Sequence, residues 1–544
     1  METTQELLSQ QAFPVLTDAQ LALLLPLGEE RPTQVGDVVF ASGQRPPVMV
    51  VVLEGETETV DPTDGAERSI IRCGPNQFVG EMGLLTGQTA YATCIVREAG
   101  RVLIIPAEAV QHVVATVPAL SDTLILAFAA RRQLLLRAAA ASLTLIGVQN
   151  SPDVLHYEEF VHRNRIPHRW LDPANPTATA LLERLGATGE ARVWVVLRGQ
   201  KALADPGLLY LAKALGLDLG FEQDGPADLL VIGAGPAGLA AAVYGASEGL
   251  NTVAIDNVAI GGQAGASSRI ENYLGFPTGI SGGDLAYRAS VQALKFGARI
   301  AVPREATRLW QEDGVFAVEL DNKQTIHARS VVIASGARYR TLGLPEQERF
   351  EGAGIYYAAT ELEARLCEGQ ETVVVGGGNS AGQAAMFLAD DARKVHLVCR
   401  GPDLALGMSQ YLVERLQESP NVEIHLNGAV TALHGRERLE GVTFVCADGV
   451  PHKATVCAVF VMIGADPHTE WLRGVLELDE RGFICTGEPP MPPARRFSPY
   501  ETSLPGVFAV GDVRSASVKR VASAVGEGSV VVQAVHQYLA AQAR

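Results

Sequence analysis

Apolar residues in the first part of the chain occur in short β-branched runs separated by glycine turns. The segment Val48–Val60 alternates apolar and polar positions, and similar runs fill the region from about Phe13 to Pro118. Short strands at such close spacing predict a β-barrel or sandwich. A longer helical pattern follows over Leu120–Ala141, which we expect to form a connector helix with Arg131 and Arg132 exposed.

The pattern then changes to alternating strands and helices between Leu143 and about Leu219. It predicts strands over 143–148, 167–171 and 193–197 and helices over 151–163, 178–185 and 208–215. From Ala227 to the end, near-continuous apolar runs predict parallel strands covered by helices on both faces. We therefore expect a multidomain chain with an all-β unit, a small α/β unit and a large α/β unit.

The charge balance excludes one class of function. The chain carries 44 Lys+Arg and 61 Asp+Glu, a net charge of −17, whereas nucleic-acid binding needs a basic face. No apolar run approaches the roughly 20 residues of a membrane helix, and the N-terminal METTQELLSQ lacks the basic and apolar segments of a signal peptide. We expect a soluble, cytoplasmic protein with no nucleic-acid or membrane partner.

The cysteines and histidines show no metal-binding spacing. Seven cysteines are scattered without a CxxC pair, which suits a reducing compartment and argues against a disulfide scaffold or a zinc site. His156, His162 and His168 also lack a ligand pattern. No metal site is predicted.

The strongest chemical motif is DLLVIGAGPAGLAAAVYGASEG. An apolar strand leads into Gly233-x-Gly235-x-x-Gly238 and then into a helix. The three glycines allow a tight turn, a close approach of a pyrophosphate and close helix–strand packing. Asp256 ends the next strand, 18 residues after Gly238, where a carboxylate can accept hydrogen bonds from a ribose. This combination predicts a dinucleotide-binding (Rossmann) fold.

A second copy of the motif follows as Gly376-x-Gly378-x-x-Ala381. Its second strand ends at Cys399-Arg400 rather than at an acid. Arg400 either pairs with a 2′-phosphate, which favours NADPH over NADH, or is a surface arginine. Two such folds in one chain predict electron transfer from a nicotinamide to a flavin.

From about Pro226 to the end, the chain resembles the low-molecular-weight thioredoxin reductases. The matching motifs, in the order of that family, are GAGPAG (233–238), GGQ (261–263), IENYLGFP (270–277), VVIASGA (331–337), GLP (343–345), GGGNSA (376–381) and SLPGVFAVGDV (503–513). The resemblance implies an FAD-binding domain over 226–345 and 464–544, an inserted NAD(P)H-binding domain over 346–463, and a homodimer.

The resemblance also implies roles for single residues. Gln263 and Asn272 should lie beside the flavin, Asp512 should bond the ribityl chain, and Lys519–Ala522 should flank the isoalloxazine. A helix cap is the alternative for Asp512. Together with the glycine motifs, the expected cofactor-binding residues are Gly233, Gly235, Pro236, Ala237, Gly238, Asp256, Gly262, Gln263, Asn272, Ala334, Gly336, Gly511, Asp512, Arg520, Val521 and Ala522 for FAD, and Gly376, Gly378, Asn379, Ser380, Ala381 and Arg400 for NADPH or NADH.

The chain departs from the family at its redox centre. The family carries CATC at the start of a helix, whereas Ala358 and Glu361 stand at the two cysteine positions here. Cys367 lies further along that helix without a partner in sequence. Of the family's basic HRRxxxR cluster only Arg400 remains. Without a dithiol beside the flavin, we do not expect ordinary thioredoxin reductase activity.

The first two units resemble other families. Residues 1–119 resemble a cyclic-nucleotide-binding β-roll. Its Gly80-Glu81 pair is present, so that Glu81 could hold a ribose hydroxyl, but Ala90 replaces the arginine that binds the cyclic phosphate. Residues 120–142 would form the connector helix. Residues 143–220 resemble a thioredoxin or glutaredoxin fold without its CxxC, and we interpret this unit as a docking or structural domain.

Three functional hypotheses follow. The first is an FAD-dependent NAD(P)H oxidoreductase that reduces an external acceptor, with Glu361 either contacting flavin or substrate or being a solvated helix-start carboxylate. The second is a flavin-based redox sensor with little turnover. The third is a thioredoxin-disulfide reductase that uses a non-standard thiol, for which Cys367 is the candidate.

Overall fold

The computed structural model of the chain describes residues 11–44, 47–61, 68–80, 83–86, 88–90, 92–137, 143–149, 151–217, 225–267, 270, 273–350, 353–357, 359, 361–436, 438–487 and 498–542. The chain separates into two compact units. The first comprises residues 1–225, 242–259 and 290–304, and the second comprises residues 226–241, 260–289 and 305–544. No helix in the described ranges combines the length and the apolar character needed to cross a membrane.

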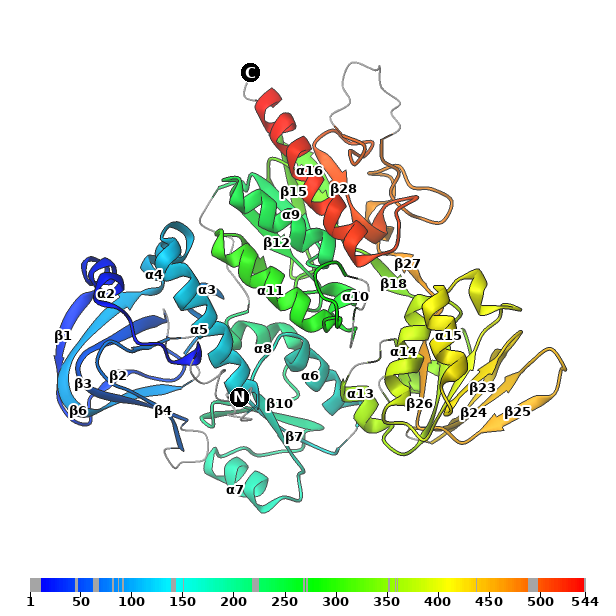
Figure 1. Ribbon diagram of the computed structural model, residues 1–544, viewed down its shortest axis with the longest axis horizontal. Coiled ribbons are helices and arrows are strands. Elements are labelled where there is room, and N and C mark those ends of the chain that lie inside the picture. The colour runs from blue at the N-terminus through cyan, green and yellow to red at the C-terminus, as the bar shows by residue number, and fades with distance from the viewer. Residues whose placement is uncertain are drawn as a thin grey trace. The chain divides into compact units, whose positions relative to one another are not determined.

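The first unit begins with an antiparallel β-roll (Figure 1). Its two long strands, β3 and β6, pair from Val48 opposite Pro106 to Val60 opposite Thr93. Strand β1 pairs with β6 and β4 with β3, while the short β2 and β5 add to the same sheet. The predicted all-β unit is confirmed. Its elements are α2 (Asp18–Leu24), η1 (Leu25–Leu27), β1 (Glu29–Thr33), β2 (Val38–Phe40), β3 (Val48–Asp61), β4 (Arg68–Cys73), β5 (Phe78–Val79), α3 (Gly83–Thr86) and β6 (Thr93–Pro106).

Two helices follow the roll, α4 (Ala107–Thr116) and α5 (Pro118–Arg137). Helix α5 covers most of the expected connector, but the expected exposure of Arg131 and Arg132 is wrong, because both side chains are buried. The Arg131 guanidinium donates to the carbonyl oxygens of Ala12 (2.7 Å) and Phe78 (2.8 Å). Backbone acceptors thus satisfy a charge that the helical pattern alone places in solvent.

The small α/β part of the first unit has the four-stranded order β10-β9-β7-β8. Strands β7 and β8 are parallel, whereas β9 is antiparallel to both β7 and β10. All six predicted elements are present. Strand β10, with the short sequence KALA, was not predicted. The bounds are β7 (Leu143–Gly147), α6 (Pro152–Arg163), β8 (His168–Leu171), α7 (Pro176–Arg184), β9 (Val193–Leu197), β10 (Lys201–Ala204) and α8 (Leu208–Leu215).

The large α/β region contributes parallel strands to both units. In the second unit, β17 lies between β11 and β28, and all three are parallel. In the first unit, β12 pairs in parallel with β13. A three-stranded antiparallel sheet, β14-β15-β16, and the pair β18-β27 complete this region. The bounds are β11 (Leu229–Ile232), α9 (Pro236–Ser247), β12 (Thr252–Ile255), α10 (Gly262–Gly265), α11 (Gly282–Lys295), β13 (Arg299–Ala301), β14 (Ala306–Glu312), β15 (Val315–Leu320), β16 (Thr325–Ala328), β17 (Val331–Ile333), β18 (Ala337–Tyr339), β27 (Ala465–Pro467), η3 (Glu470–Leu472), β28 (Val507–Ala509), η5 (Gly511–Val513) and α16 (Val521–Gln542).

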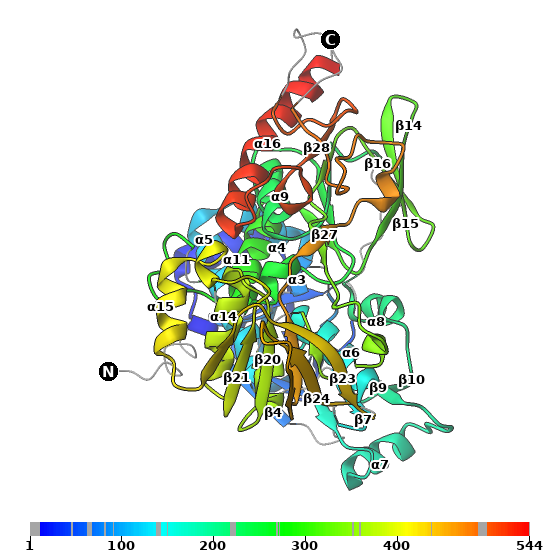
Figure 2. The ribbon, with the colours of Figure 1, turned by 90° about the vertical axis from the view of Figure 1, so that its right-hand side faces the viewer.

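The inserted part of the second unit has three layers (Figures 1 and 2). Its parallel sheet has the order β19-β26-β20-β21-β22. Val374 and Leu397 pack with α14 and α15 on one face, whereas Val373 and Val398 pack against the β23-β24-β25 sheet on the other. The bounds are α12 (Gln347–Phe350), β19 (Ile355–Tyr356), α13 (Glu361–Leu366), β20 (Glu371–Val375), α14 (Asn379–Ala389), β21 (Lys394–Val398), η2 (Leu404–Leu406), α15 (Gln410–Glu418), β22 (Val422–His425), β23 (Ala429–Gly435), β24 (Leu439–Val445), β25 (Pro451–Ala454) and β26 (Ala458–Val461).

Candidate dinucleotide-binding sites

The first glycine motif forms the turn between β11 and α9. Gly233 has a φ of +107°, and a Cβ placed on it would lie 2.2 Å from the carbonyl oxygen of Ala334. A Cβ on Gly238 would lie 1.7 Å from the Gly233 oxygen, so the helix packs directly on the turn. Gly235 differs, since its Cβ would meet only the Cα of Gly262, at 3.9 Å. This open backbone surface at a helix start fits a pyrophosphate.

A second glycine loop faces the first. The N–H of Gly261 donates to the carbonyl oxygen of Ala234 (2.7 Å). Gly262 follows with a φ of +53° and starts α10, and Gln263 in that helix donates its side-chain amide to the carbonyl oxygen of Ala337. The fold therefore brings Gly235 and Gly262 together, as the resemblance implies. Their contacts with FAD stay predictions.

Asp512 lies just after β28, in the short helix η5. Its carboxylate is half-buried. Burial raises the pKa of Asp512, although the positive charge of Lys519 acts to lower it. Within the described ranges, no group donates a hydrogen bond to this carboxylate, while Lys519 donates to the backbone carbonyl of Asp512. A half-buried acceptor of this kind fits a hydroxyl-bearing ligand such as a ribityl chain.

Glu527 on α16 positions this acid, and sequence reasoning missed it. One of its carboxylate oxygens accepts the N–H of Gly511 (2.7 Å), and both oxygens bind Arg514 (2.5 and 3.2 Å). A Cβ on Gly511 would lie 2.9 Å from the Cβ of Ala237, so the strand end also packs on α9. Of the other predicted residues, Ala334 and Gly336 follow β17, Arg520 precedes α16, and Val521 and Ala522 begin it.

Two further predicted positions have different outcomes. Asp256, in the first unit, accepts the N–H groups of Val258 (3.1 Å) and Ala259 (3.3 Å) with one carboxylate oxygen. It therefore stabilises the turn after β12, a structural role that the motif did not indicate, and its ribose contact stays a prediction. Asn272 lies outside the described residues.

The second glycine motif joins β20 to α14. A Cβ on Gly376 would lie 2.4 Å from the carbonyl oxygen of Met462 and 2.9 Å from the Cβ of Ala381, which explains the glycine and the small third residue. Gly378 caps the helix, and its Cβ would approach only the Gly407 oxygen, at 3.7 Å. The second motif thus also leaves an open backbone surface at a helix start, which fits a pyrophosphate.

Of the predicted residues beside this turn, one stabilises a neighbouring loop and two are exposed. Asn379 accepts the N–H of Ser409 (2.7 Å), so its side chain holds the loop before α15. Ser380 and Arg400 are exposed, and Arg400 comes after the buried Cys399, the first residue beyond β21. Both remain accessible to a nucleotide.

Comparisons with known proteins agree with this geometry. The family model described as pyridine nucleotide-disulphide oxidoreductase matches residues 227–528. The chain belongs to the pyridine nucleotide-disulphide oxidoreductases. Membership confirms the predicted FAD-dependent NAD(P)H oxidoreductase.

Thioredoxin reductases are among the most similar members of this family. That of Streptomyces clavuligerus is 32% identical over 319 residues, which are 58% of this chain and 95% of the relative. That of Mycoplasma genitalium is 34% identical over 307 residues, 56% of this chain and 93% of the relative. The crystal structure of T. acidophilum thioredoxin reductase, 29% identical, has a TM-score of 0.53 and covers 58% of this chain and 99% of its own.

This oxidoreductase lacks cysteines where the resemblance places the redox pair. Ala358 lies outside the described residues, and Glu361 begins α13 with its side chain outside them as well. Both possible roles of Glu361, contact with flavin and solvated helix start, therefore stay predictions.

A different thiol pair is present instead. The buried Cys367, which follows α13, lies beside Cys457, which precedes β26, and its thiol also contacts the hydroxyl of Thr372 (4.0 Å). Interaction with Cys457 and burial raise the pKa of Cys367, whereas interaction with Cys367 lowers the pKa of Cys457. Cys457 in turn donates to the carbonyl oxygen of Glu371 (3.4 Å). No sequence signal indicated the pair, because only the pairing of β20 with β26 brings its members together.

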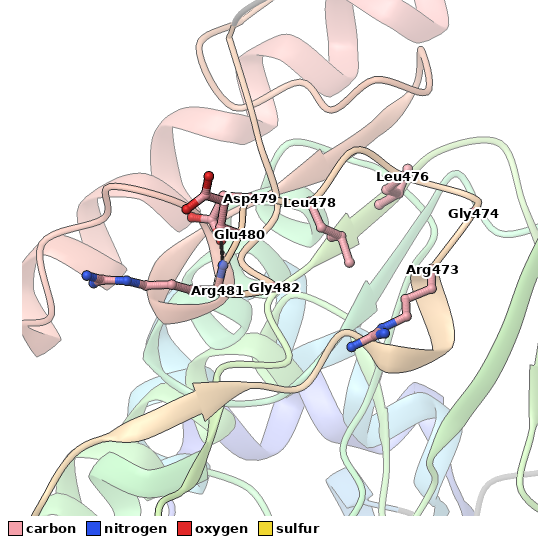
Figure 3. Close-up of a pocket in the computed structure, with 8 residues that line it drawn as sticks. All are labelled: Arg473, Gly474, Leu476, Leu478, Asp479, Glu480, Arg481 and Gly482. Atoms are coloured by element: carbon pink, nitrogen blue, oxygen red, sulfur yellow. Dashed lines mark hydrogen bonds between the residues drawn. The ribbon is translucent and has the colours of Figure 1, made fainter.

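One pocket of about 450 Å³ lies in the loop 473–482 (Figure 3). Its most buried acid, Asp479, accepts the N–H groups of Arg481 and Phe483 (2.9 Å each) and the hydroxyl of Ser515 (2.7 Å). These bonds use the Asp479 carboxylate to hold the loop in place. None of the predicted cofactor residues lines it.

The N-terminal resemblance is also confirmed, since the cyclic nucleotide-binding domain model matches residues 30–130. Glu81 lies outside the described residues, and Ala90 packs against the apolar core of the roll. Sequence reasoning missed Glu58, a buried acid on β3 that binds Ser69 (2.6 Å), Arg97 (2.6 Å) and Arg72 (3.1 Å). These two arginines are thus engaged by a carboxylate within the roll.

Proposed function

We propose that this oxidoreductase takes a hydride from NAD(P)H and passes the electrons to an external acceptor, without a dithiol of its own beside the flavin. Its support is the contrast between two glycine turns open to pyrophosphates, at Gly235 and Gly378, and the replacement of both redox cysteines by Ala358 and Glu361. FAD, when bound, supplies the step between a two-electron hydride donor and the acceptor.

The chain's own residues bind and orient the two cofactors. Gly235 and Gly262 admit the FAD pyrophosphate, and Asp512 accepts a hydrogen bond from the ribityl hydroxyls. Glu527 holds the Gly511 backbone so that this acid is presented at a fixed position. On the nucleotide side, Gly378 admits the second pyrophosphate and Arg400 faces the ribose phosphate of NADPH.

The acceptor classes are a protein electron carrier, a quinone, oxygen or an external disulfide. The relatives named thioredoxin reductase support a protein acceptor. In thiol–disulfide exchange, electrons leave through a thiolate, and the start of α13 offers none. We therefore place the acceptor's reactive group directly against the flavin rather than against a cysteine of this chain.

An anaerobic reductive titration tests this proposal. One equivalent of NADPH or NADH per FAD should bleach the flavin completely, because only the flavin stores electrons. A redox-active disulfide in contact with the flavin would take up a second equivalent and contradict the proposal. A subsequent screen of reduced enzyme against quinones, oxygen, thioredoxin and a small disulfide then identifies the acceptor class. The proposal would also be refuted if neither NADPH nor NADH bleached the flavin.

The Cys367–Cys457 contact gives the thiol-dependent alternative a specific form. In that alternative, Cys457 is the attacking thiol, because its interaction with Cys367 lowers its pKa. The Cys457→Ser variant should then lose disulfide reduction while flavin bleaching by NADPH persists. Our proposal expects no loss of turnover with any acceptor in this variant.

The accessory domains are proposed to regulate or dock rather than to catalyse. In the roll, the Glu58 network and the apolar setting of Ala90 disfavour a cyclic phosphate, which needs a buried cation. The order β10-β9-β7-β8 supports a thioredoxin-like middle domain, although it carries no CxxC.

A homodimer is inferred from the family, and sedimentation would test it. A sensor with negligible turnover remains the alternative and predicts no steady-state NAD(P)H oxidation with any acceptor.

A further inference from the structure

One face of the inserted parallel sheet carries a cluster of polar side chains at its β22 edge. His396 on β21 stands opposite Glu423 on β22 in the strand register, and Val398 stands opposite His425. Alternation along the strands puts the cluster on the face toward β23-β24-β25, opposite α14 and α15 (Figure 2). The ring of Phe444 on β24 lies 4.7 Å from that of His425 and 6.0 Å from that of His396, centroid to centroid.

The hydrogen bonds define the tautomer of His396. Its Nε2 lies 3.1 Å from a carboxylate oxygen of Glu371. An ionised carboxylate only accepts, so in the neutral imidazole the proton is on Nε2 and a lone pair is on Nδ1. That Nδ1 faces Nε2 of His425 at 3.1 Å. Two imidazole nitrogens therefore converge from neighbouring strands, and one of them is fixed as an acceptor.

A carboxylate completes the set. The two oxygens of Glu423 lie 3.9 Å from His396 Nδ1 and 3.8 Å from His425 Nε2. One ligand atom from each of the three residues lies within 4.8 Å of the others. A tetrahedral ion with bonds of about 2.0–2.1 Å separates its ligands by roughly 3.3 Å. The observed separations thus need only small side-chain rotations to close around an ion.

We propose that His396, Glu423 and His425 form a binding site for one divalent transition-metal ion of the zinc class, which clamps β21 to the edge strand β22. Two imidazoles and one carboxylate are donors that zinc accepts, with water in the fourth position. Glu371 supplies the outer carboxylate that orients a ligating histidine through its second ring nitrogen.

Lys394 competes with the ion for Glu423. Its ammonium forms an ion pair with a Glu423 carboxylate oxygen, and its side chain is 39% exposed. Metal binding must therefore displace this ammonium into solvent, which costs affinity. Removing the ammonium should free the carboxylate, so Lys394→Met should bind the ion more tightly than the natural chain. A cluster that serves only as a hydrogen-bond network would not respond in this way.

The test titrates metal-free, FAD-loaded full-length protein with Co²⁺, followed by visible absorption, and with Zn²⁺ by calorimetry. We expect one equivalent and the d–d bands of four-coordinate Co²⁺. His425→Gln should weaken binding at least tenfold, and Lys394→Met should strengthen it several-fold. His452→Gln is the matched control, because this ring also stacks on Phe444 but does not belong to the three-residue ligand group; the metal affinity of this variant should change less than twofold.

Thermal melts separate a lost site from a lost fold. Zn²⁺ should raise the melting temperature of the natural chain and of His452→Gln but not that of His425→Gln. Absence of stoichiometric binding would overturn the proposal, as would unchanged binding by His425→Gln. An intense thiolate-to-Co²⁺ charge-transfer band would also overturn it, because it would assign the ion to a cysteine. None of these outcomes depends on flavin reduction, so the oxidoreductase proposal stands or fails separately.

Discussion

Glu527 holds the Gly511 backbone through one carboxylate oxygen (2.7 Å) while it binds Arg514 through both (2.5 and 3.2 Å). The pair is largely buried, with 11% of the Glu527 side chain and 19% of the Arg514 side chain exposed. Because Gly511 directly precedes Asp512, helix α16 sets the position of the predicted ribityl-binding acid.

Glu527→Ala should therefore weaken FAD binding and the fold together. It leaves Arg514 buried without its partner, which costs roughly 2–4 kcal/mol of unfolding free energy. FAD content, measured as flavin absorbance per protein, should fall at least tenfold at limiting FAD. Glu527→Gln keeps an acceptor for the Gly511 N–H and should lose less. The exposed Glu477→Ala serves as the control, and an equal loss in that variant would contradict this role.

Gly235→Ala should separate cofactor binding from folding. The added methyl meets only Gly262 Cα, at 3.9 Å, so the unfolding free energy should change by less than about 1 kcal/mol. The methyl nevertheless occupies the surface that the pyrophosphate approaches, and FAD affinity should fall at least tenfold.

Gly233→Ala is the matched comparison. With a φ of +107° and a Cβ only 2.2 Å from a backbone oxygen, it should destabilise the fold by at least about 2 kcal/mol. Chemical denaturation measures the unfolding free energy of both variants, and flavin absorbance measures their FAD content. If Gly235→Ala bound FAD as tightly as the natural chain, the proposal that the pyrophosphate lies at this turn would be wrong.

Arg400→Ala should test the choice of nucleotide. If the exposed guanidinium pairs with a 2′-phosphate, the Kd for NADPH should rise about tenfold and the Kd for NADH should not change. The dependence of the anaerobic flavin-reduction rate on nucleotide concentration measures both. Arg436→Ala, an exposed arginine on the same domain, is the control. Equal effects on the two nucleotides would make Arg400 a surface residue.

Local chemistry explains what the sequence could predict. The glycine motifs and the apolar parallel strands are local patterns, and the structure contains each of them. Strand β10 was missed because KALA shows no alternation. The burial of Arg131 was also missed, because its carbonyl partners come from distant segments.

The unpredicted parts of the sites are contacts between distant segments. Glu527 lies mid-helix, where a lone glutamate usually is a surface residue, and only packing on Gly511 reveals its role. Cys367 and Cys457 meet through a strand pairing. His396 and His425 have no recognisable ligand spacing, because they converge from two parallel strands. Spacing rules detect ligands within one helix or loop and not across a sheet.

The two thiols should differ in reactivity. Interaction between the two thiols lowers the pKa of Cys457 and, with burial, raises that of Cys367. N-ethylmaleimide at pH 7 should therefore alkylate Cys457 at least ten times faster than Cys367. Peptide mapping by mass spectrometry measures both rates. Cys367→Ser should slow the alkylation of Cys457, since a hydroxyl at this site forms a weaker bond to sulfur; faster labelling of Cys367 would contradict the assignment.

The β-roll should lose stability in acid through Glu58. The hydroxyl of Ser69, with Arg97 and Arg72, lowers the pKa of Glu58 from 4.5 to about 2 against the effect of burial. A folded-state pKa below the unfolded one means that the stabilisation is complete above about pH 4.5 and is lost as the pH falls toward 2.

Glu58→Gln should lower the unfolding free energy by roughly 1–3 kcal/mol at pH 7 and flatten this acid dependence. Hydrogen exchange of the β3 and β6 amides between pH 7 and pH 3, corrected for intrinsic rates, measures it locally. The exposed Glu98→Gln should keep the natural profile, and an acid dependence that survives in Glu58→Gln would assign the effect to another carboxylate.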